Sequence, residues 1–258
     1  MKTVIVTQEE PFYIPVLLGK VLTEYDRVVA VIILPPIPKG FTAVSYVRRL
    51  YEVFGLKDFL AYGALFTHHK FLDLLSRLRQ FKRFYSVKTA VTRNSIPLYR
   101  LNNINNPESL NLLKSLEPEI IISVASPQIF KKEIVNLAKH AINIHAALLP
   151  QYRGMMPSFW VLAKGEEKTG VTVHYMNENI DTGNIIFQKA IDISLEDTLH
   201  SLQNRVASEG ATALLEALNR IEKSDDIEVS LNRGEASYHS FPTKEGAKEF
   251  RARGRRFI

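Results

Sequence analysis

Two short segments in the second half of the chain carry residue types capable of acid–base chemistry. Asn143 and His145 stand two residues apart, and Asp181 follows in a turn-like sequence that ends with Thr182 and Gly183. An amide, an imidazole and a carboxylate can together supply a donor to a developing oxyanion, an acid or base, and an orienting group. Because alternate residues of a strand share a face, Asn143 and His145 are expected to point to the same side.

The same residue types also have a plainer structural interpretation. A histidine at a strand end is often a satisfied core residue, and Asp-x-Gly is often only a turn. The chain contains no cysteine, no hydroxyl nucleophile pairs with His145 in a familiar motif, and the adjacent His68 and His69 lack the spacing of metal ligands. These observations favour attack by water or by the substrate's own nucleophile, and a site without metal.

The elements that would position these residues alternate between strand and helix. Strands are predicted at residues 2–7, 28–34, 95–101, 119–124, 141–145, 169–176 and 184–191. Helices are predicted at 12–24, 41–84 with breaks near Gly55 and Gly63, 107–116, 127–138, 157–164 and 195–221. The order predicts an α/β fold with a doubly wound, mostly parallel Rossmann-like sheet and a mixed edge after residue 145. Such sheets bind ligands at the carboxyl ends of their strands, where Asn143 and His145 would lie.

The charge of the chain is unevenly distributed. The formal net charge is +6, and Lys and Arg concentrate in residues 68–93 and 243–258. Such clusters are typical either of an anionic partner or of a solvated helix face and a basic tail. The beginning of the chain lacks the pattern of a signal peptide, and no apolar run is long enough to span a membrane. We therefore expect a cytoplasmic protein without a membrane partner.

The predicted domain organisation is a catalytic domain at residues 1–222, with a helical insertion at about 41–93, and a short C-terminal extension at 223–258 ending in a basic tail. The insertion is rich in aromatic and basic residues. Binding of an anionic acceptor and formation of a packed elaboration with a homodimer surface explain that composition equally well.

Four linked motifs carry a family resemblance. They are Asn143-x-His145, Leu148-Leu149-Pro150-x-Tyr152-Arg153-Gly154, Thr169-Gly170-Val171-Thr172 and Asp181-Thr182-Gly183. The segment from residue 119 to 213 resembles the folate-dependent formyltransferases, which include methionyl-tRNA, glycinamide ribonucleotide and nucleotide-sugar N-formyltransferases. The resemblance implies N10-formyltetrahydrofolate as formyl donor and no metal, and it places Asn143, His145 and Asp181 at the family's catalytic positions.

The resemblance also implies where the substrates bind. The pterin of the folate would lie against a loop formed by Pro127, Gln128 and Ile129. It would also contact the turn that contains Met176, Glu178 and Ile180. Tyr152 and Arg153 would shape the mouth for the acceptor. Asp181 would orient His145 and favour its protonated form, whereas His174 is interpreted as a structural strand residue.

Two departures from the family guide the choice of acceptor. The turn after the first strand lacks the glycine-rich sequence that would hold a substrate phosphate. Only a short segment follows the 195–221 helix, where methionyl-tRNA formyltransferases carry a C-terminal domain. The first expectation is therefore a small, anionic amine such as a nucleotide-linked amino sugar, and no nucleic-acid acceptor. The alternatives are a methionyl-tRNA formyltransferase-like enzyme, a formyltetrahydrofolate hydrolase, and a non-enzymatic RNA- or polyanion-binding protein.

Overall fold

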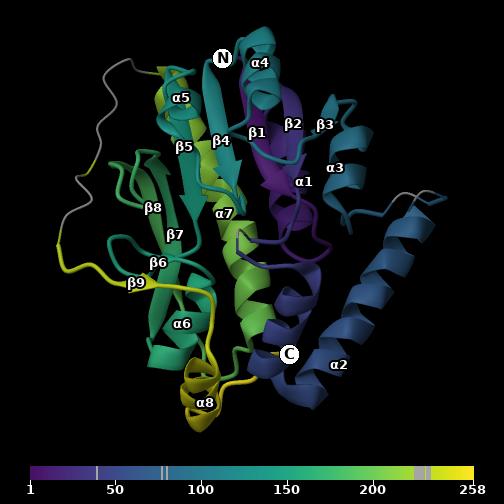
Figure 1. The fold of residues 1–258 in the computed structure, drawn as a ribbon, viewed down its shortest axis with the longest axis vertical. Helices are drawn as coiled ribbons and strands as arrows, with labels where there is room; N and C mark the ends of the chain where they lie inside the picture. The colour runs from purple at the N-terminus through teal and green to yellow at the C-terminus, as the bar shows by residue number, and fades with distance from the viewer. Residues whose placement is uncertain (39, 77, 80, 224–229, 231–233) are drawn as a thin grey trace.

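A seven-stranded sheet with the order β3-β2-β1-β4-β5-β7-β8 forms the centre of the computed structural model (Figure 1), which describes residues 1–38, 40–76, 78–79, 81–223, 230 and 234–258. The parallel strands are β1 (Thr3–Gln8), β2 (Val28–Leu34), β3 (Leu98–Arg100), β4 (Ile120–Val124) and β5 (His140–His145). The strands β7 (Lys168–Tyr175) and β8 (Ile185–Asp192) run antiparallel at one edge. The predicted fold class and mixed edge are confirmed.

Helices cover both faces of this sheet. The helices α1 (Ile14–Glu24), α3 (Val87–Arg93) and α7 (Leu199–Lys223) lie on one side, and α4 (Pro107–Leu116) and α5 (Lys132–Val135) on the other. Alternation along β1 divides the core, because Ile5 packs with α1 and Val4 packs towards α4 and α5. In the same way Ile142 of β5 faces α1 and α7, so Asn143 and His145 face the opposite side.

Two helices of the structure differ from the predicted elements because side chains bind the main chain over long distances. The helix predicted at 127–138 is reduced to α5, since the amide of Lys131 donates to Asn105 Oδ1 (2.8 Å) instead of a carbonyl within a helix. The short α3 was not predicted. Its first amides, those of Val87 and Lys88, donate to the carboxylate of Glu9 at 2.9 and 3.1 Å, a contact that local spacing does not reveal.

The long helix α2 (Ala43–Ser76) is kinked at Gly55, which has a φ of 70°, whereas Gly63 remains helical. A kink leaves carbonyl groups of the preceding turn without helical partners. Arg251, from α8 (Lys244–Ala252), donates to the carbonyls of Val53 and Phe54 at 3.0 and 2.5 Å. The C-terminal helix therefore holds the two halves of α2 at their junction.

Much of the concentrated positive charge is bonded inside the molecule. In the tail, Arg253 donates to the carbonyl of Ala163 at the end of α6 (Pro157–Lys164), and Arg255 donates to Ser194 and Leu195. In the 68–93 cluster, Arg83 and Arg93 also donate to carbonyls; Arg77 lies outside the described residues. These guanidinium groups satisfy the ends of turns and helices, which accounts for part of the charge without an anionic partner.

The C-terminal extension is described only in part, because residues 224–229 and 231–233 of the predicted 223–258 segment lie outside the described residues. The rest packs on the body: β9 (Tyr238–His239) pairs with β6 (Arg153–Gly154), and α8 packs against α6. The predicted domain boundary stays a prediction. Among the described residues, none of the helices combines the length and apolar character needed to cross a membrane.

The contact between Arg251 and the kink can be tested by mutation. We expect Arg251→Ala to lower the free energy of unfolding by about 1–2 kcal/mol, because two carbonyls lose a charged donor that is partly replaced by water. The measurement is urea denaturation, with the exposed Lys248→Ala on the same helix as control. Equal stability of the two variants would show that the guanidinium does not hold the kink.

Candidate active site

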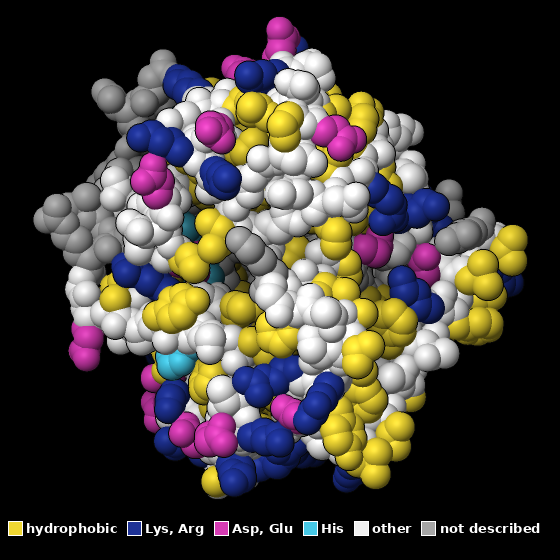
Figure 2. Space-filling view, in the orientation of Figure 1, with side chains coloured by type: hydrophobic (Ala, Val, Ile, Leu, Met, Phe, Trp, Pro, Cys, Tyr) yellow, Lys and Arg dark blue, Asp and Glu magenta, His cyan; other side chains and the backbone are white. Residues whose placement is uncertain are grey.

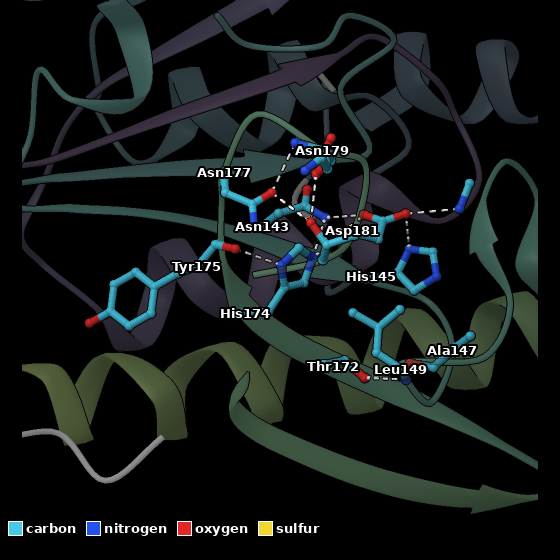
Figure 3. Close-up of polar contacts among 12 residues, drawn as sticks. Asn143, His145, Ala147, Leu149, Thr172, His174, Tyr175, Asn177, Asn179 and Asp181 are labelled. Atoms are coloured by element: carbon cyan, nitrogen blue, oxygen red, sulfur yellow. Dashed lines mark hydrogen bonds and ion pairs between the residues drawn. The ribbon is translucent and has the colours of Figure 1, made fainter. Parts of the chain in front are cut away.

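Polar side chains of β5 and β7 gather on one face of the sheet (Figure 3). In the antiparallel register Asn143 pairs with His174 and His145 pairs with Thr172. Because paired residues of neighbouring strands point to the same face, four polar side chains stand together on the side opposite α1 and α7. This position is at the carboxyl end of β5, where sheets of this kind bind ligands.

Thr172 fixes the path of the chain after β5. Its buried hydroxyl donates to the carbonyl of Ala147 (2.7 Å) and accepts from the amide of Leu149 (3.2 Å). Gln188 of β8 adds a further donor to the same oxygen at 2.8 Å. The segment that follows β5 is thereby held close to β7, and it brings the carbonyl of Tyr152 and the amide of Gly154 to the cluster.

Asp181 lies at the centre of the cluster. Its Oδ2 accepts from the amide of Gly154 (2.9 Å) and is 3.4 Å from His145 Nδ1. Its Oδ1 is 3.4 Å from Asn143 Nδ2 and 3.5 Å from His174 Nε2. The structure therefore brings together all three residues that the sequence analysis assigned to catalysis, and it adds His174.

The loop that carries Asp181 passes very close to the end of β7. A Cβ at Gly183 would lie 1.7 Å from the carbonyl oxygen of Tyr175, so only glycine permits this approach. Asp181 itself has a φ of 52°, the left-handed conformation that Asp tolerates better than most residues. The sequence Asp-x-Gly is typical of a plain turn, but here the fold requires both Asp181 and Gly183 so that the carboxylate points back towards β5.

His174 sets the orientation of Asn143. Its Nδ1 donates to the carbonyl of Tyr175 (2.8 Å), so in the neutral ring Nε2 accepts from Asn143 Nδ2 (3.1 Å). His174 is almost fully buried and belongs to the polar cluster, although its sequence context indicated only a structural role. The signal that could have identified it is the strand register, which places it opposite Asn143 and which spacing alone does not give.

The electrostatics of the cluster favour a neutral histidine beside an ionised aspartate. Burial lowers the pKa of His145 below its usual value, and the opposing effect of Asp181 does not reverse this. The expected protonated form of His145 is therefore not favoured at neutral pH. Burial alone would raise the pKa of Asp181, but the positive charge of His145 when its ring is protonated, the contact with His174 and the Gly154 amide lower it to about 2. The neutral His145 donates from Nε2 to the carbonyl of Tyr152 (2.8 Å), which leaves Nδ1 facing the carboxylate.

Tyr152 and Arg153, which were expected to shape the acceptor mouth, have different environments. The Tyr152 side chain is buried, where its hydroxyl donates to Glu166 and its ring stacks on His239 at a centroid distance of 5.3 Å. Its contact with the cluster is through the main-chain carbonyl. Arg153 stands in β6, paired with Tyr238.

A pocket of about 360 Å³ lies on the same sheet face, between the end of α5, the start of β5 and the end of β7. Its lining residues are Val135, Asn136, Ala138, Lys139, Ala141, Tyr175 and Met176. Ala141 stands two residues before Asn143, so the pocket adjoins the polar cluster on one face. The sequence analysis missed most of these residues; the small Ala141 before Asn143 was the available signal.

Of the residues expected to hold the folate, Met176 alone lines this pocket. The Gln128 side chain is bonded to the amide of Ile104 and the carbonyl of Asn102, at 2.9 and 2.8 Å. Glu178 pairs with Lys132 at 3.6 Å. Pro127 is half-buried, and Ile129 and Ile180 are exposed. Within the described ranges, no set of three or more His, Asp or Glu side chains is placed to hold a metal ion.

Comparison with known proteins decides the family. A sequence profile described as "Formyl transferase" matches residues 64–218, more than half of the chain. The chain belongs to this formyl transferase family. Its members are enzymes that transfer formyl groups, and the cluster around Asp181 lies within the matched residues.

Among relatives in this family, the methionyl-tRNA formyltransferase of Clostridioides difficile (strain 630) is 39% identical over 153 residues, 59% of this chain and 50% of that protein. The methionyl-tRNA formyltransferase of Alkaliphilus oremlandii (strain OhILAs) is 35% identical over 163 residues, 63% of this chain and 53% of that one. This chain thus spans about half the length of the curated relatives it matches.

Solved structures of formyltransferases share the fold. An N-formyltransferase from Helicobacter canadensis, in complex with folinic acid and dTDP-3-aminofucose, has a TM-score of 0.60 at 22% identity, covering 100% of this chain and 81% of that one. Glycinamide ribonucleotide transformylase 1 from Symbiobacterium toebii also has a TM-score of 0.60, at 15% identity, covering 90% of this chain and 95% of that one.

The low pKa of Asp181 predicts how stability depends on pH. A carboxyl whose pKa falls from 3.8 to about 2 on folding contributes about 2 kcal/mol above pH 5. That contribution is lost as the pH falls through the folded pKa, and about half is gone at pH 3. Between pH 5 and pH 3, we expect the free energy of unfolding to fall by about 1 kcal/mol more in the wild type than in Asp181→Asn.

The control for this experiment is Asp26→Asn, because Asp26 is exposed on the surface. Denaturant titrations at several pH values measure both variants. If Asp181→Asn and Asp26→Asn differ from the wild type by amounts that do not change with pH, the Asp181 carboxylate is not stabilised in the way the cluster implies.

Proposed function

We propose that this protein transfers a formyl group from N10-formyltetrahydrofolate to the amine of a small acceptor. The observation that carries the proposal is the Asp181 carboxylate, which joins Asn143 and His145 at the carboxyl end of β5, on the sheet face that also carries a ligand-sized pocket near the start of that strand. Membership of the formyl transferase family supports the reaction type.

The pocket beside the cluster fits a flat, partly apolar ring system such as a pterin. Its volume of about 360 Å³ is within the range of small-molecule sites. Val135, Ala138 and Met176 offer apolar contacts, and Asn136 and Lys139 offer polar groups. A folate seated there would place its formyl group towards Asn143, the next residue on that face after Ala141.

The bound folate supplies an activated formyl group, and the residues of this chain supply donors and a proton acceptor. Asn143 Nδ2 has a contact of 3.1 Å to His174 Nε2 and a longer one of 3.4 Å to Asp181. Asn143 can give up the longer contact, to Asp181, and donate instead to the formyl oxygen as negative charge develops on that oxygen. His174 keeps the amide in the correct orientation during that exchange.

His145 and Asp181 together manage the proton that the attacking amine loses. Burial keeps His145 neutral, and its Nδ1 lies 3.4 Å from Asp181 Oδ2. A proton taken up at Nδ1 is held by the adjacent carboxylate while Nε2 stays bonded to Tyr152. The same pair can then return the proton to the nitrogen that leaves the formyl carbon, so acid and base roles balance.

The segments that follow β1 do not favour binding of a phosphate group of the acceptor. Glu10 accepts from the amides of Phe12 and Tyr13, which precede α1, and from the amide of Ile14, the first residue of α1. Burial raises the pKa of Glu10 to about 7 despite these three donors. Since Glu9 accepts from the first amides of α3 in the same way, side chains of this chain already occupy the N-termini of α1 and α3, where an anion would otherwise bind.

An exposed aromatic ring beside the cluster supports a nucleotide-linked acceptor. Tyr238 of β9 is 58% exposed, and its ring lies so close to Gly154 that a Cβ there would be 2.9 Å away. Gly154 is the residue whose amide binds Asp181. A base or sugar stacked on Tyr238 would bring an attached amine next to the cluster. We therefore propose a nucleotide-linked amino sugar, the acceptor class named for the Helicobacter canadensis enzyme.

Methionyl-tRNA is the second candidate acceptor. It is supported by the 35–39% identity to methionyl-tRNA formyltransferases over 153–163 residues of this chain. An assay with folate donor and a panel of amino-sugar nucleotides, glycinamide ribonucleotide and methionyl-tRNA separates the two, with products identified by mass spectrometry. Transfer to methionyl-tRNA alone would exclude the amino-sugar proposal and retain formyl transfer.

Substitutions in the cluster should affect turnover more than binding. We expect Asn143→Ala and His145→Ala each to lower kcat by ~10²-fold or more, because their contacts matter most as charge develops. Asp181→Asn should be similarly severe. Folate affinity, measured by calorimetry, should change by less than about threefold. His68→Ala, an exposed histidine on α2, is the control, and a double Asn143/His145 alanine variant with wild-type turnover would refute the assignment.

The proposed stacking on Tyr238 predicts a selective effect on the acceptor. Tyr238→Ala should raise the KM for the acceptor by roughly tenfold, since stacking on a base contributes about 1–3 kcal/mol. The KM for the folate should not change, and Tyr238→Phe should restore acceptor binding. Tyr51→Ala, an exposed tyrosine of α2, serves as the control. A wild-type acceptor KM in Tyr238→Ala would remove Tyr238 from the acceptor site.

A further inference from the structure

The second half of α2, after the kink at Gly55, has an inner face that is bonded to the body of the protein. Tyr62 stacks on Phe54 at a centroid distance of 4.8 Å, and His69 Nδ1 donates to the carbonyl of Pro11 (2.8 Å). Asp73 is buried and accepts from the hydroxyl of Ser86 at 2.8 Å. Positions 62, 69 and 73 lie on one side of a helix. These contacts fix the rotation of the helix about its axis.

The opposite side of this helix, which we call the outer face, is apolar and exposed. It consists of Leu56, Leu60, Gly63, Ala64, Thr67, Phe71 and Leu74. The spacing of these residues follows the 3.6-residue period, with Leu78 just beyond the helix. The large side chains among them, Leu78 included, are 55–84% exposed. Phe66 lies nearer the inner face and packs on Phe12 at a centroid distance of 6.2 Å. Figure 2 shows hydrophobic side chains gathered along the edge of the molecule on which α2 runs.

The outer face is symmetric in sequence about Thr67. Reversing the helix about this residue places Leu60 opposite Leu74 and Gly63 opposite Phe71. Gly63 has open space around it, with no atom within 4 Å of where a Cβ would stand. The Thr67 hydroxyl donates to the carbonyl of Gly63 (2.9 Å), so the residue presents its methyl group outward. A ring at 71 therefore has a matching gap at 63 on an antiparallel copy of the same helix.

We infer that the outer face of α2 binds the outer face of a second copy of this chain, with the two helices antiparallel and Thr67 at the two-fold axis. The surface is large enough for such a pair. Five large apolar side chains, Leu78 included, each expose more than half of their surface, and together they amount to roughly 600 Å² per chain. Two copies would bury roughly 1,200 Å², the lower limit of stable specific interfaces.

The centre of the outer face distinguishes a second chain from a lipid surface. Helices that lie in a bilayer need bulky apolar residues throughout their buried face. Gly63, Ala64 and Thr67 instead form a shallow centre between Leu60 and Phe71, which another helix can fill at close approach. The cations Lys57 and Lys70 lie at the margins, where they remain in water beside the paired helices.

The first test is the mass of the full chain in solution. We expect a species of twice 29.4 kDa by light scattering at micromolar concentration. Leu60→Glu should raise the dissociation constant of the dimer by ~100-fold or more, since it buries a charge in the contact opposite Leu74 of the second copy. The control is Leu195→Glu, because Leu195 is 88% exposed outside α2 and should leave the dimer intact. A wild-type protein that is monomeric at about 100 μM would overturn the proposal.

Gly63→Leu gives a second test that separates the packed pair from a merely apolar surface. The added side chain enters open space in the single chain and improves helix propensity, so the fold is preserved. It also fills the gap for Phe71, so the dimer should weaken by ~10-fold or more. If Gly63→Leu instead tightens self-association, or increases sedimentation of the protein with phosphatidylserine vesicles, the antiparallel pairing is wrong.

A cross-link tests the position of the two-fold axis. The chain contains no cysteine, so Thr67→Cys introduces a single thiol at the proposed axis. Two such thiols facing each other across closely packed helices are within disulfide reach. Mild oxidation should convert Thr67→Cys to a covalent dimer and leave Leu195→Cys largely monomeric. Equal cross-linking of the two variants would exclude Thr67 as the axis.

Discussion

The carboxylate of Asp181 is the contact on which the candidate site depends. Four groups from three segments meet on its two oxygens: the Asn143 amide and the His145 imidazole of β5, the His174 imidazole of β7 and the Gly154 amide. Strand pairing and Thr172 bring these segments together, and the carboxylate satisfies polar groups whose burial would otherwise cost free energy. The charge of Asp181 therefore organises the site as well as taking part in its chemistry.

Local pattern was sufficient to predict the framework of the site. The strands β2 and β4 are largely apolar runs, β5 alternates polar and apolar residues, and the helices α4 and α6 begin with proline at the residues where the structure has them. The two-residue spacing of Asn143 and His145 indicated a shared face, because alternation is a property of any strand. These features depend only on neighbours in the sequence.

What could not be predicted depends on partners distant in the chain. His174 belongs to the cluster because of the register between β5 and β7, which no local spacing specifies. The protonation of His145 follows from its burial, and the sequence contains no measure of burial at a single position. Tyr152 was assigned to the acceptor mouth by its motif, yet Glu166 and His239 hold its side chain in the interior. Long-range side-chain contacts explain each of these differences.

The position of Arg251 has a consequence for how the protein is made. The carbonyls it binds are 197 and 198 residues earlier in the chain, so a nascent chain contains the kink of α2 long before it contains the group that secures it. During synthesis, domains begin to fold from the N-terminus, and α2 must wait with its two halves unlocked until α8 leaves the ribosome. The two bonds that secure the kink can form only then, whereas the contacts of Tyr62, His69 and Asp73 with the body can form earlier.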